Sequence, residues 1–307
     1  MSPIRKLIID CDPGIDDALA LLLACASPEI ELMAVTAVAG NRSVETTAAN
    51  AGRVLNAAGR RGVPVFSGCA RPLAHVSPRF NLIHGEDGLG GVWLSTGRIP
   101  DATHATDHIA RALYESEPDT LVIAAIGPMT NLALVEIKHP GLLKRARSLL
   151  VMGGAAFCPG NITPNAEFNF HADALAAHVV LNAGSNLHLF GLDVTSRAVM
   201  PEAWIESFAD LDTRCARAAH DMMRAYAARD PWLHDACPIA YLLDPTLFTG
   251  ESCCVSVDWR PGPSEGQTSA WRACDERRPH PPNAQVFTDV DGERLRALLH
   301  SRIASLP

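Results

Sequence analysis

The chain has 307 residues, of which 48% are hydrophobic and 20% charged, and its formal net charge is −8. This composition is that of an ordinary globular protein with enough apolar material for a core. The acidic balance and the lack of a basic run argue against nucleic acid as a partner, because binding to phosphates requires clustered Lys and Arg. The longest apolar stretch, 18–26, is too short to span a bilayer, so no membrane partner is expected.

Two further features predict a cytoplasmic location. Residues 1–10 read directly as a strand, without the basic start and small-residue cleavage site of a signal peptide. The nine cysteines are an odd number, and no two of them form a CxxC pair. We therefore expect reduced and mostly buried thiols.

Apolar strand-like runs and helix-like runs alternate along most of the chain. Strands are predicted at 5–10, 30–40, 63–68, 119–127, 147–154 and 186–194. Helices are predicted between them at 16–27, 43–59, 103–118, 129–140 and 172–184. Apolar strands separated by amphipathic helices are typical of a mainly parallel sheet with helices on both faces. The sequence therefore predicts a doubly wound α/β fold, as a single domain over residues 1–307.

Three stretches depart from this alternation. Residues 69–101 are rich in Pro, Gly and His and are predicted to form a long loop over the sheet edge. Residues 195–236 are predicted to be mostly helical, and residues 259–283 to form a loop or irregular hairpin. Long loops in compact domains are often functional.

Polar residues and glycines follow the predicted strands at the edge where such folds bind ligands. They are Asp10 and Asp12, Gly40–Asn41, Gly127, Met152–Gly153–Gly154 and Asp193. The sequence therefore predicts a binding site at the carboxyl ends of the strands.

Asp10, Asp12, Asp16 and Asp17 lie within eight positions, between the first predicted strand and the first predicted helix. Carboxylates at close range repel one another, and a hard divalent cation such as Ca²⁺ or Mg²⁺ would relieve that repulsion. The intervening Pro13–Gly14 forces a turn that can bring the two helix-start aspartates back toward the strand end. A metal site is therefore expected here.

Other interpretations of this cluster fit less well. N-capping would suit the pair at the helix start but not the pair at the strand end. An EF-hand loop counted from Asp10 fails, because its fifth position is Gly14 and its twelfth is Leu21. Asp10-Cys11-Asp12 has the spacing of the Mg²⁺ site in haloacid-dehalogenase-type phosphatases, but Pro-Gly-Ile-Asp-Asp follows where those sites want Thr or Val.

The motif DCDPGIDDA (10–18) is similar to the signature of the inosine–uridine-preferring nucleoside hydrolases. Further blocks follow in the order of that family: AGN (39–41), IHGEDGLGG (83–91), IGPMTNLA (126–133), VMGG (151–154), GNITPNAEFN (160–169), GLDVT (191–195) and HDACPIAYLLDP (234–245). The block at 160–169 especially resembles the bacterial non-specific ribonucleoside hydrolases. The resemblance implies a Rossmann-like fold and calcium-dependent hydrolysis of ribonucleosides to ribose and free base, in nucleoside salvage.

The resemblance also implies a metal site and two catalytic residues. One Ca²⁺ per subunit would be held by Asp12, Asp17, Asp235 and the backbone carbonyl of Ile126, with water and ribose hydroxyls completing the shell. Asp12 would in addition be the general base, and His234 the acid that protonates the leaving base. Taken alone, Asp235 would instead be a helix N-cap and His234 an ordinary loop histidine.

The implied reaction needs residues for the sugar and for the base. Polar side chains matched to three ribose hydroxyls are expected to reject 2′-deoxynucleosides; the candidates are Asp16, Asn41, Asn161, Glu167 and Asn169. Met152 would pack under the sugar, and Asp10 would orient the metal loop without binding the metal. His84 lies in the loop expected to close over the base, and Tyr226 or His220 could stack on the base or hydrogen-bond to it.

Two alternatives to a hydrolase stay open at this point. A phosphatase of the Asp-x-Asp type would release phosphate with Mg²⁺ and require Asp10, whereas a calcium-dependent nucleoside-binding module would bind without turnover. The sequence does not decide between pyrimidine and purine nucleosides as substrates. The family resemblance leads us to expect a homodimer or homotetramer.

Overall fold

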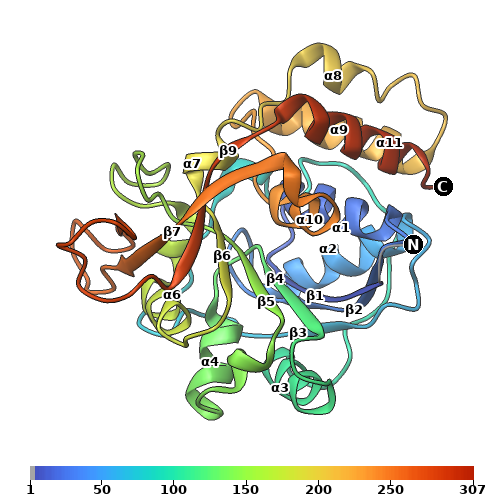
Figure 1. Cartoon of the computed structure of the whole chain (residues 1–307). Helices are drawn as coiled ribbons and strands as arrows, with labels where there is room; N and C mark the ends of the chain where they lie inside the picture. Colours follow the sequence, from blue (N-terminus) through green and yellow to red (C-terminus); the bar gives the residue numbers. More distant parts are fainter. Residues whose placement is uncertain (1–3) are drawn as a thin grey trace.

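In the computed structural model, which describes residues 4–307, nine strands form one sheet in the order β3-β2-β1-β4-β5-β6-β9-β7-β8 (Figure 1). They are β1 (Arg5–Cys11), β2 (Ile30–Ala37), β3 (Val65–Ser67), β4 (Leu121–Ala125), β5 (Ser148–Met152), β6 (Leu187–Phe190), β7 (Phe248–Val257), β8 (Thr268–Arg272) and β9 (Ala284–Val290). Neighbours from β3 to β9 are parallel, and β7 is antiparallel to both β9 and β8. The strand order reverses between β1 and β4, as in doubly wound sheets, so the predicted fold class is confirmed.

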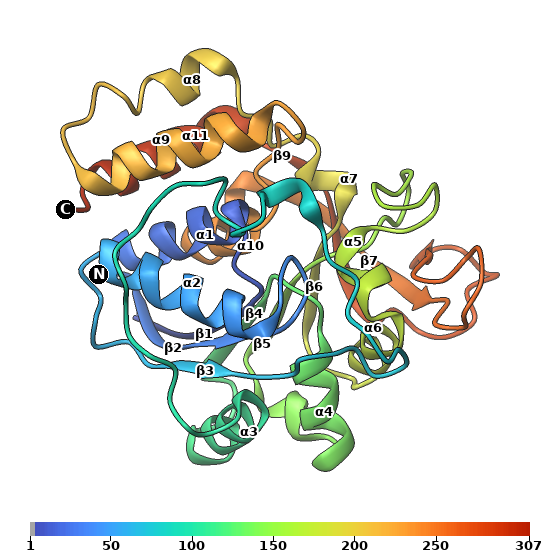
Figure 2. The same ribbon diagram turned by 180° about the vertical axis from the view of Figure 1, so that it is seen from behind.

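Helices cover both faces of this sheet (Figures 1 and 2). One face carries α3 (Ala105–Glu115), α4 (Thr130–Lys138) and α6 (Ala174–Leu181). The other carries α1 (Ile15–Ala26), α2 (Val44–Ala57), α9 (Arg214–Ala227), α10 (Ala236–Leu243) and α11 (Gly292–Ala304). The shorter helices are α5 (Phe168–Ala172), α7 (Leu192–Thr195), α8 (Glu202–Glu206), η1 (Leu82–His84), η2 (Leu142–Arg145) and η3 (Pro245–Leu247).

β1 shows why the central strands are apolar in their buried part. Side chains alternate between the two faces along a strand. Leu7, Ile9 and Cys11 join the core that includes α1 and α10, whereas Ile8 joins the core that includes α3 and α4. All four side chains are fully buried. A strand covered on both faces therefore has no position for a polar side chain until it reaches its carboxyl end.

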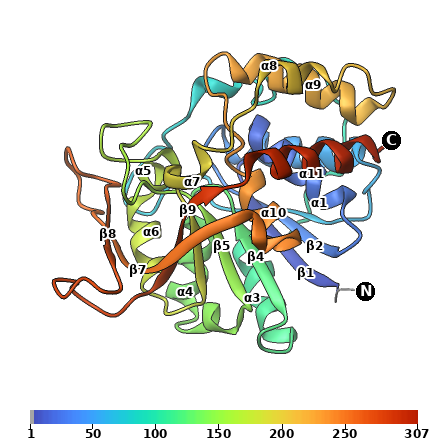
Figure 3. The same ribbon diagram turned by 45° about the horizontal axis from the view of Figure 1, so that its top comes forward.

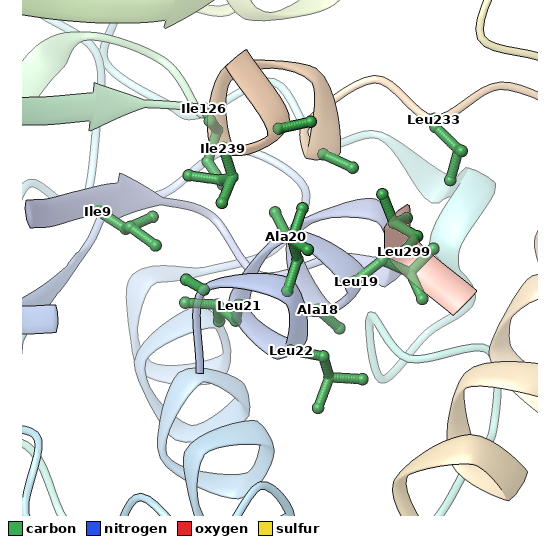
Figure 4. Close-up of a cluster of buried hydrophobic side chains, with 14 of the residues drawn as sticks. Ile9, Ala18, Leu19, Ala20, Leu21, Leu22, Ile126, Leu233, Ile239 and Leu299 are labelled. Carbon is green, nitrogen blue, oxygen red and sulfur yellow. The ribbon is translucent and has the colours of Figure 1, made fainter. Parts of the chain in front are cut away.

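α1 is buried around its whole circumference, and this fixes its N-terminus at the site. Every residue from Ile15 to Cys25 is buried. Figure 4 shows the apolar side chains of α1 among Ile9 of β1, Ile239 of α10 and Leu299 of α11. A helix that is apolar on all sides is typical of a central core position. Its two N-terminal aspartates are therefore held rigidly beside the end of β1.

The C-terminal part departs most from the sequence prediction. The strand predicted at 186–194 ends at Phe190, because Gly191 begins the short helix α7. β7, β9 and α11 lie outside the predicted elements, and the stretch at 259–283 contains β8, which completes a hairpin with β7. Figure 3 shows α11 leaving the end of β9 and running alongside α9.

Two expectations from composition concern the class of protein. Within residues 4–307, no helix combines the length and apolar character needed to cross a membrane. All nine cysteines are unpaired, and seven of them are buried. The prediction that most of the thiols are buried is therefore confirmed, and their reduced state stays a prediction.

Candidate active site

A pocket lies at the carboxyl ends of the central strands, where the fold predicts a site. Its lining comprises Asp12, Asp16, Asn41, Asn81, His84, Ile126, Met152, Asn161, Glu167, Phe168, Asn169, Tyr226, Asp230, His234 and Asp235. The structure thus brings together both candidate catalytic residues and every substrate-binding candidate named above except His220. Asp17 and Asp10 are fully buried and do not reach the pocket surface.

The turn at Pro13–Gly14 brings the aspartates at the start of α1 back to the end of β1, as the sequence predicts. Asp17 Oδ1 accepts the backbone N–H of Asp12 at 3.1 Å, and Asp17 Oδ2 accepts that of Gly14 at 2.9 Å. These bonds fold the start of α1 back onto the end of β1. Carboxylate oxygens of Asp16, Asp17 and Asp235 lie within 4.8 Å of one another, because α10 packs against α1.

Asp12 sits beside this triplet with one oxygen free. Its Oδ2 accepts the backbone N–H of Asn41 at 2.6 Å, while Oδ1 is buried and has no hydrogen-bond partner within residues 4–307. A Cβ at Gly40 or Gly127 would overlap this carboxylate, so both neighbours are glycine where Asp12 needs space. A buried, unpartnered carboxylate oxygen is costly unless something compensates it.

The electrostatics of the cluster fit a cation. Burial, followed by the charge of Asp17, raises the pKa of Asp12 well above its ordinary value. Burial and the charge of Asp16 raise the pKa of Asp17 to about 7. Burial and the same Asp16 charge also raise the pKa of Asp235. No Lys or Arg lines the pocket, so a hard divalent cation is the natural partner for these oxygens. The three aspartates whose oxygens lie close together are Asp16, Asp17 and Asp235, and Asp12 is not one of them. The sequence analysis instead expected Asp12, and not Asp16, as a metal ligand.

We expect the chelated protein to lose stability as the pH rises from about 4 to about 7. The pKa of Asp17 is about 7 in the folded protein against an ordinary 3.8, so the folded state binds this proton more tightly than the unfolded state. The stabilisation from this proton is complete at a pH below the ordinary pKa of Asp17. It is lost as the pH rises through the pKa that Asp17 has in the folded protein. The thermal midpoint of EDTA-treated protein should therefore be lower at pH 8 than at pH 5.

Added Ca²⁺ should raise this midpoint more at pH 8 than at pH 5, because the ionised carboxylates bind it. Asp17→Asn is the control, since an amide does not ionise, and its midpoint should depend less on pH. Chelated wild-type protein that is as stable at pH 8 as at pH 5 would contradict this assignment.

His234 lines the same pocket, directly before the N-cap residue Asp235 of α10, and is buried. Its Nδ1 is 2.8 Å from Thr195 Oγ1, and its Nε2 is 3.1 Å from Asp230 Oδ1. Burial by itself lowers the pKa of His234. The hydrogen bond and charge of Asp230, together with the charges of Asp16 and Glu167, outweigh this and raise that pKa above its ordinary value. A protonated imidazole near neutral pH is suited to act as an acid.

Glu167 organises the loop that carries the polar ribose candidates. It caps α5 by accepting the backbone N–H groups of Asn169 at 2.8 Å and Phe170 at 3.1 Å. It also accepts the N–H of Gly154 from the end of β5 at 2.8 Å. Burial raises the pKa of Glu167, although these N–H bonds oppose that rise. The loop is therefore tied to the sheet through one buried carboxylate.

Two amides complete this wall of the pocket. Asn169 Nδ2 donates to the carbonyl of Ile126 at 3.0 Å and to that of Met152 at 3.3 Å. Asn161 Oδ1 accepts the backbone N–H of Phe168 at 3.0 Å. The Ile126 carbonyl, which the resemblance assigns to the metal, thus already accepts one hydrogen bond and retains a second lone pair.

An aromatic pair lines the pocket beside the start of α1. His84 stacks on Tyr226 with ring centroids 5.0 Å apart, and Tyr226 Oη donates to Asp16 Oδ2 at 3.4 Å. His84 Nδ1 accepts the backbone N–H of Ile15 at 3.2 Å, so a neutral ring carries its proton on Nε2. Burial lowers the pKa of His84 and so favours that neutral form. His220 lies outside the pocket, where it contacts Asp221 and Glu206.

Asp10 lies behind the cluster, in a network of its own. Its Oδ1 accepts Thr36 Oγ1 at 2.5 Å and Asn131 Nδ2 at 2.8 Å. Burial raises the pKa of Asp10 to about 6, and these two hydrogen bonds partly oppose the rise. This position agrees with a role in orienting the end of β1, which stays a prediction.

The sequence model of the inosine-uridine preferring nucleoside hydrolases matches residues 7–297. The chain belongs to this family. It is 39% identical to the pyrimidine-specific ribonucleoside hydrolase RihA of Photobacterium profundum, over 98% of this chain and 99% of that protein. It is 36% identical to the inosine-uridine preferring nucleoside hydrolase of Leishmania major, over 96% of each.

Solved structures agree with this assignment. A plant nucleoside hydrolase, PpNRh1, superposes with a TM-score of 0.91 at 31% identity, over 98% of this chain and 99% of that one. A purine-preferring ribonucleoside hydrolase from Gardnerella vaginalis gives 0.90 at 30% identity, over 98% of both chains. The protein is thus an enzyme of the nucleoside hydrolase family, which argues against the phosphatase and binding-module alternatives.

Three residues of this nucleoside hydrolase pocket are absent from the sequence prediction: Asn81, Phe168 and Asp230. Asn81 begins η1 by accepting the backbone N–H of Ile83 at 3.2 Å. Phe168 lies inside one of the family-like blocks and contributes an apolar surface. Asp230 precedes His234 by four residues, and an acidic residue so close to a candidate acid was the available signal.

Proposed function

We propose that this protein hydrolyses the N-glycosidic bond of ribonucleosides to ribose and free base, with Ca²⁺ in the aspartate cluster. One observation carries the proposal. A buried carboxylate cluster, with an unpartnered Asp12 oxygen, and the buried His234–Asp230 pair line one pocket. Hydrolysis of this bond needs a base for the attacking water and an acid for the leaving group.

The cation would be held by Asp12, Asp17 and Asp235 together with the carbonyl of Ile126, leaving Asp16 to meet a ribose hydroxyl. Bound there, Ca²⁺ would supply Lewis acidity that favours deprotonation of water. Four protein ligands plus water and two sugar hydroxyls suit the 6–8 oxygen ligands of calcium better than the strict octahedron of magnesium.

The general base and the general acid would be different residues of the pocket. Asp12 would accept the proton of the attacking water, since its Oδ1 is free of other hydrogen bonds. The ribose acquires oxocarbenium character as the bond lengthens. When the C–N bond breaks, the electron pair stays on the base, and His234 would deliver a proton to it. Asn161, Glu167 and Asn169 would orient the ribose.

We propose that His84 and Tyr226, which stack on each other in the pocket lining, contact the base. The relatives named above are described as pyrimidine-specific, inosine-uridine preferring and purine-preferring, so they do not fix one base for this chain. Uridine is compatible with the first two descriptions. We therefore propose uridine as the first substrate to test, with cytidine, inosine and adenosine beside it.

Release of reducing sugar from these four nucleosides tests the proposal. The proposal predicts ribose from at least one of them. Nucleoside binding by calorimetry with no ribose from any of the four would contradict it and favour a binding protein.

The polar side chains proposed to bind the ribose predict that kcat/KM depends strongly on the 2′-hydroxyl of the substrate. We expect kcat/KM for 2′-deoxyuridine to be about 10³-fold or more below that for uridine, because the buried polar groups that meet this hydroxyl would be left unpaired. Parallel initial-rate measurements with the two substrates check this. Similar kcat/KM values for the two substrates would show that the proposed ribose-binding residues do not contact the 2′-hydroxyl.

A further inference from the structure

The backbone around Asp230 is fixed independently of the Asp230 side chain. Its N–H donates to the carbonyl of Tyr226 at 3.0 Å, just after α9 ends. On the other side, the N–H of Met200 donates to the carbonyl of Pro231 at 2.7 Å. The loop between α9 and α10 is thus held by main-chain bonds, and the Asp230 side chain is available for another purpose.

That side chain makes one hydrogen bond within residues 4–307, in which Oδ1 accepts from His234 Nε2 at 3.1 Å. The two side chains are 11% and 5% exposed, respectively. The other ring nitrogen lies 2.8 Å from Thr195 Oγ1. A hydroxyl can donate or accept, whereas a carboxylate only accepts. Asp230 is therefore the group that requires a proton on Nε2.

We propose that Asp230 is a positioning residue for His234: before the substrate enters, its carboxylate accepts the Nε2–H and so holds the imidazole with that N–H on the pocket side, within reach of the leaving base. This inference rests on the proposed function, in which His234 is the acid. An entering base would take over the Nε2–H hydrogen bond from Asp230. As the C–N bond breaks, the proton passes from Nε2 to the base nitrogen that received the electron pair. The ring keeps its Nδ1–H on Thr195, and solvent returns a proton to Nε2.

Among residues 4–307, Asp230 is the one charged group that hydrogen-bonds to the His234 ring. Asp16 and Glu167 also bring negative charge toward the ring, but neither hydrogen-bonds to it. The oxygens of Glu167 already accept backbone N–H groups. The second histidine of the pocket, His84, accepts from the backbone of α1. The orientation of the His234 ring therefore depends on Asp230 and Thr195.

The test compares two leaving groups in the Ca²⁺-loaded enzyme. Asp230→Ala is expected to lower kcat for uridine by about tenfold or more, a part of the 10²–10⁴ typical of a general acid. Turnover of p-nitrophenyl riboside should stay close to wild type, because a nitrophenolate leaves without a proton. Asp230→Asn keeps the packing, but its NH₂ can turn toward Nε2, so it should also fail with uridine.

Asp221→Ala is the matched control. Asp221 pairs with His220 at 2.9 Å on the exposed side of α9, outside the pocket. Its removal should leave the turnover of both substrates unchanged.

Equal loss with both substrates would overturn the inference, because Asp230 would then support only the shape of the pocket. Unchanged uridine turnover in both Asp230 variants would overturn it as well. His234→Ala, measured in the same experiment, distinguishes a failure of the Asp230 inference from a failure of the proposed acid role of His234. If only His234→Ala depends on the leaving group, the inference about Asp230 fails alone. If His234→Ala shows no such dependence, the acid assignment fails and the inference fails with it.

Discussion

Asp12→Ala is expected to reduce kcat for uridine by about 10³-fold or more, because it removes a general base and a cation ligand in one step. The protein should remain folded. Oδ1 of Asp12 is buried without a partner, so deleting the carboxylate also deletes an electrostatic cost. Initial rates at saturating Ca²⁺, together with the thermal midpoint of the same preparation, check both expectations.

Asp173→Ala is the matched control for this change. Asp173 is equally buried but lies away from the pocket, where it caps α6 and accepts the hydroxyl of Thr130 at 2.7 Å. Its loss should cost about 1–2 kcal/mol of stability, as for other caps, with kcat retained. Asp12→Ala protein that keeps more than a tenth of wild-type kcat would contradict the catalytic assignment of Asp12.

His234→Ala is expected to separate substrates by their leaving groups. Turnover of uridine should fall by about 10²–10⁴, the usual contribution of a general acid. Turnover of p-nitrophenyl riboside should change far less, since its leaving group is stable as an anion. The measurement is kcat for both substrates in wild type and variant under identical conditions.

Tyr114→Phe provides a control on an aromatic residue remote from the pocket. Tyr114 is exposed on α3, beside His139, and both substrates should react with it as with wild type. Equal losses for uridine and p-nitrophenyl riboside in His234→Ala would mean that His234 supports the pocket without transferring a proton.

The sequence predicted the strands that helices cover on both faces of the sheet. β4 is apolar throughout, and β1 is apolar from Leu7 to Ile9, because helices pack on each side; this pattern is visible in the sequence. β7 and β9 lie at the antiparallel end of the sheet, where exposed positions such as Thr249 and Asp289 interrupt the apolar pattern. Their pairing also depends on contacts between distant segments, which local periodicity does not reveal.

The candidate site was predictable where its residues follow strands and less so where they come from α9. Tyr226 and His220 both belong to this helix, but their positions differ by six residues, so they lie about 120° apart around its axis. Only Tyr226 can therefore face the pocket, and local sequence did not show which of the two would. Asp230 escaped prediction because its contact with His234 depends on the path of the loop after α9.

Chelation and restoration of activity test the central claim most directly. Ribose release from uridine would be measured before EDTA treatment, after it, and after adding back Ca²⁺ or Mg²⁺ to the dialysed protein. The account predicts that EDTA abolishes release and that Ca²⁺ restores it more fully than Mg²⁺. Undiminished release from protein shown by elemental analysis to be metal-free would contradict the assignment of the aspartate cluster as a catalytic cation site.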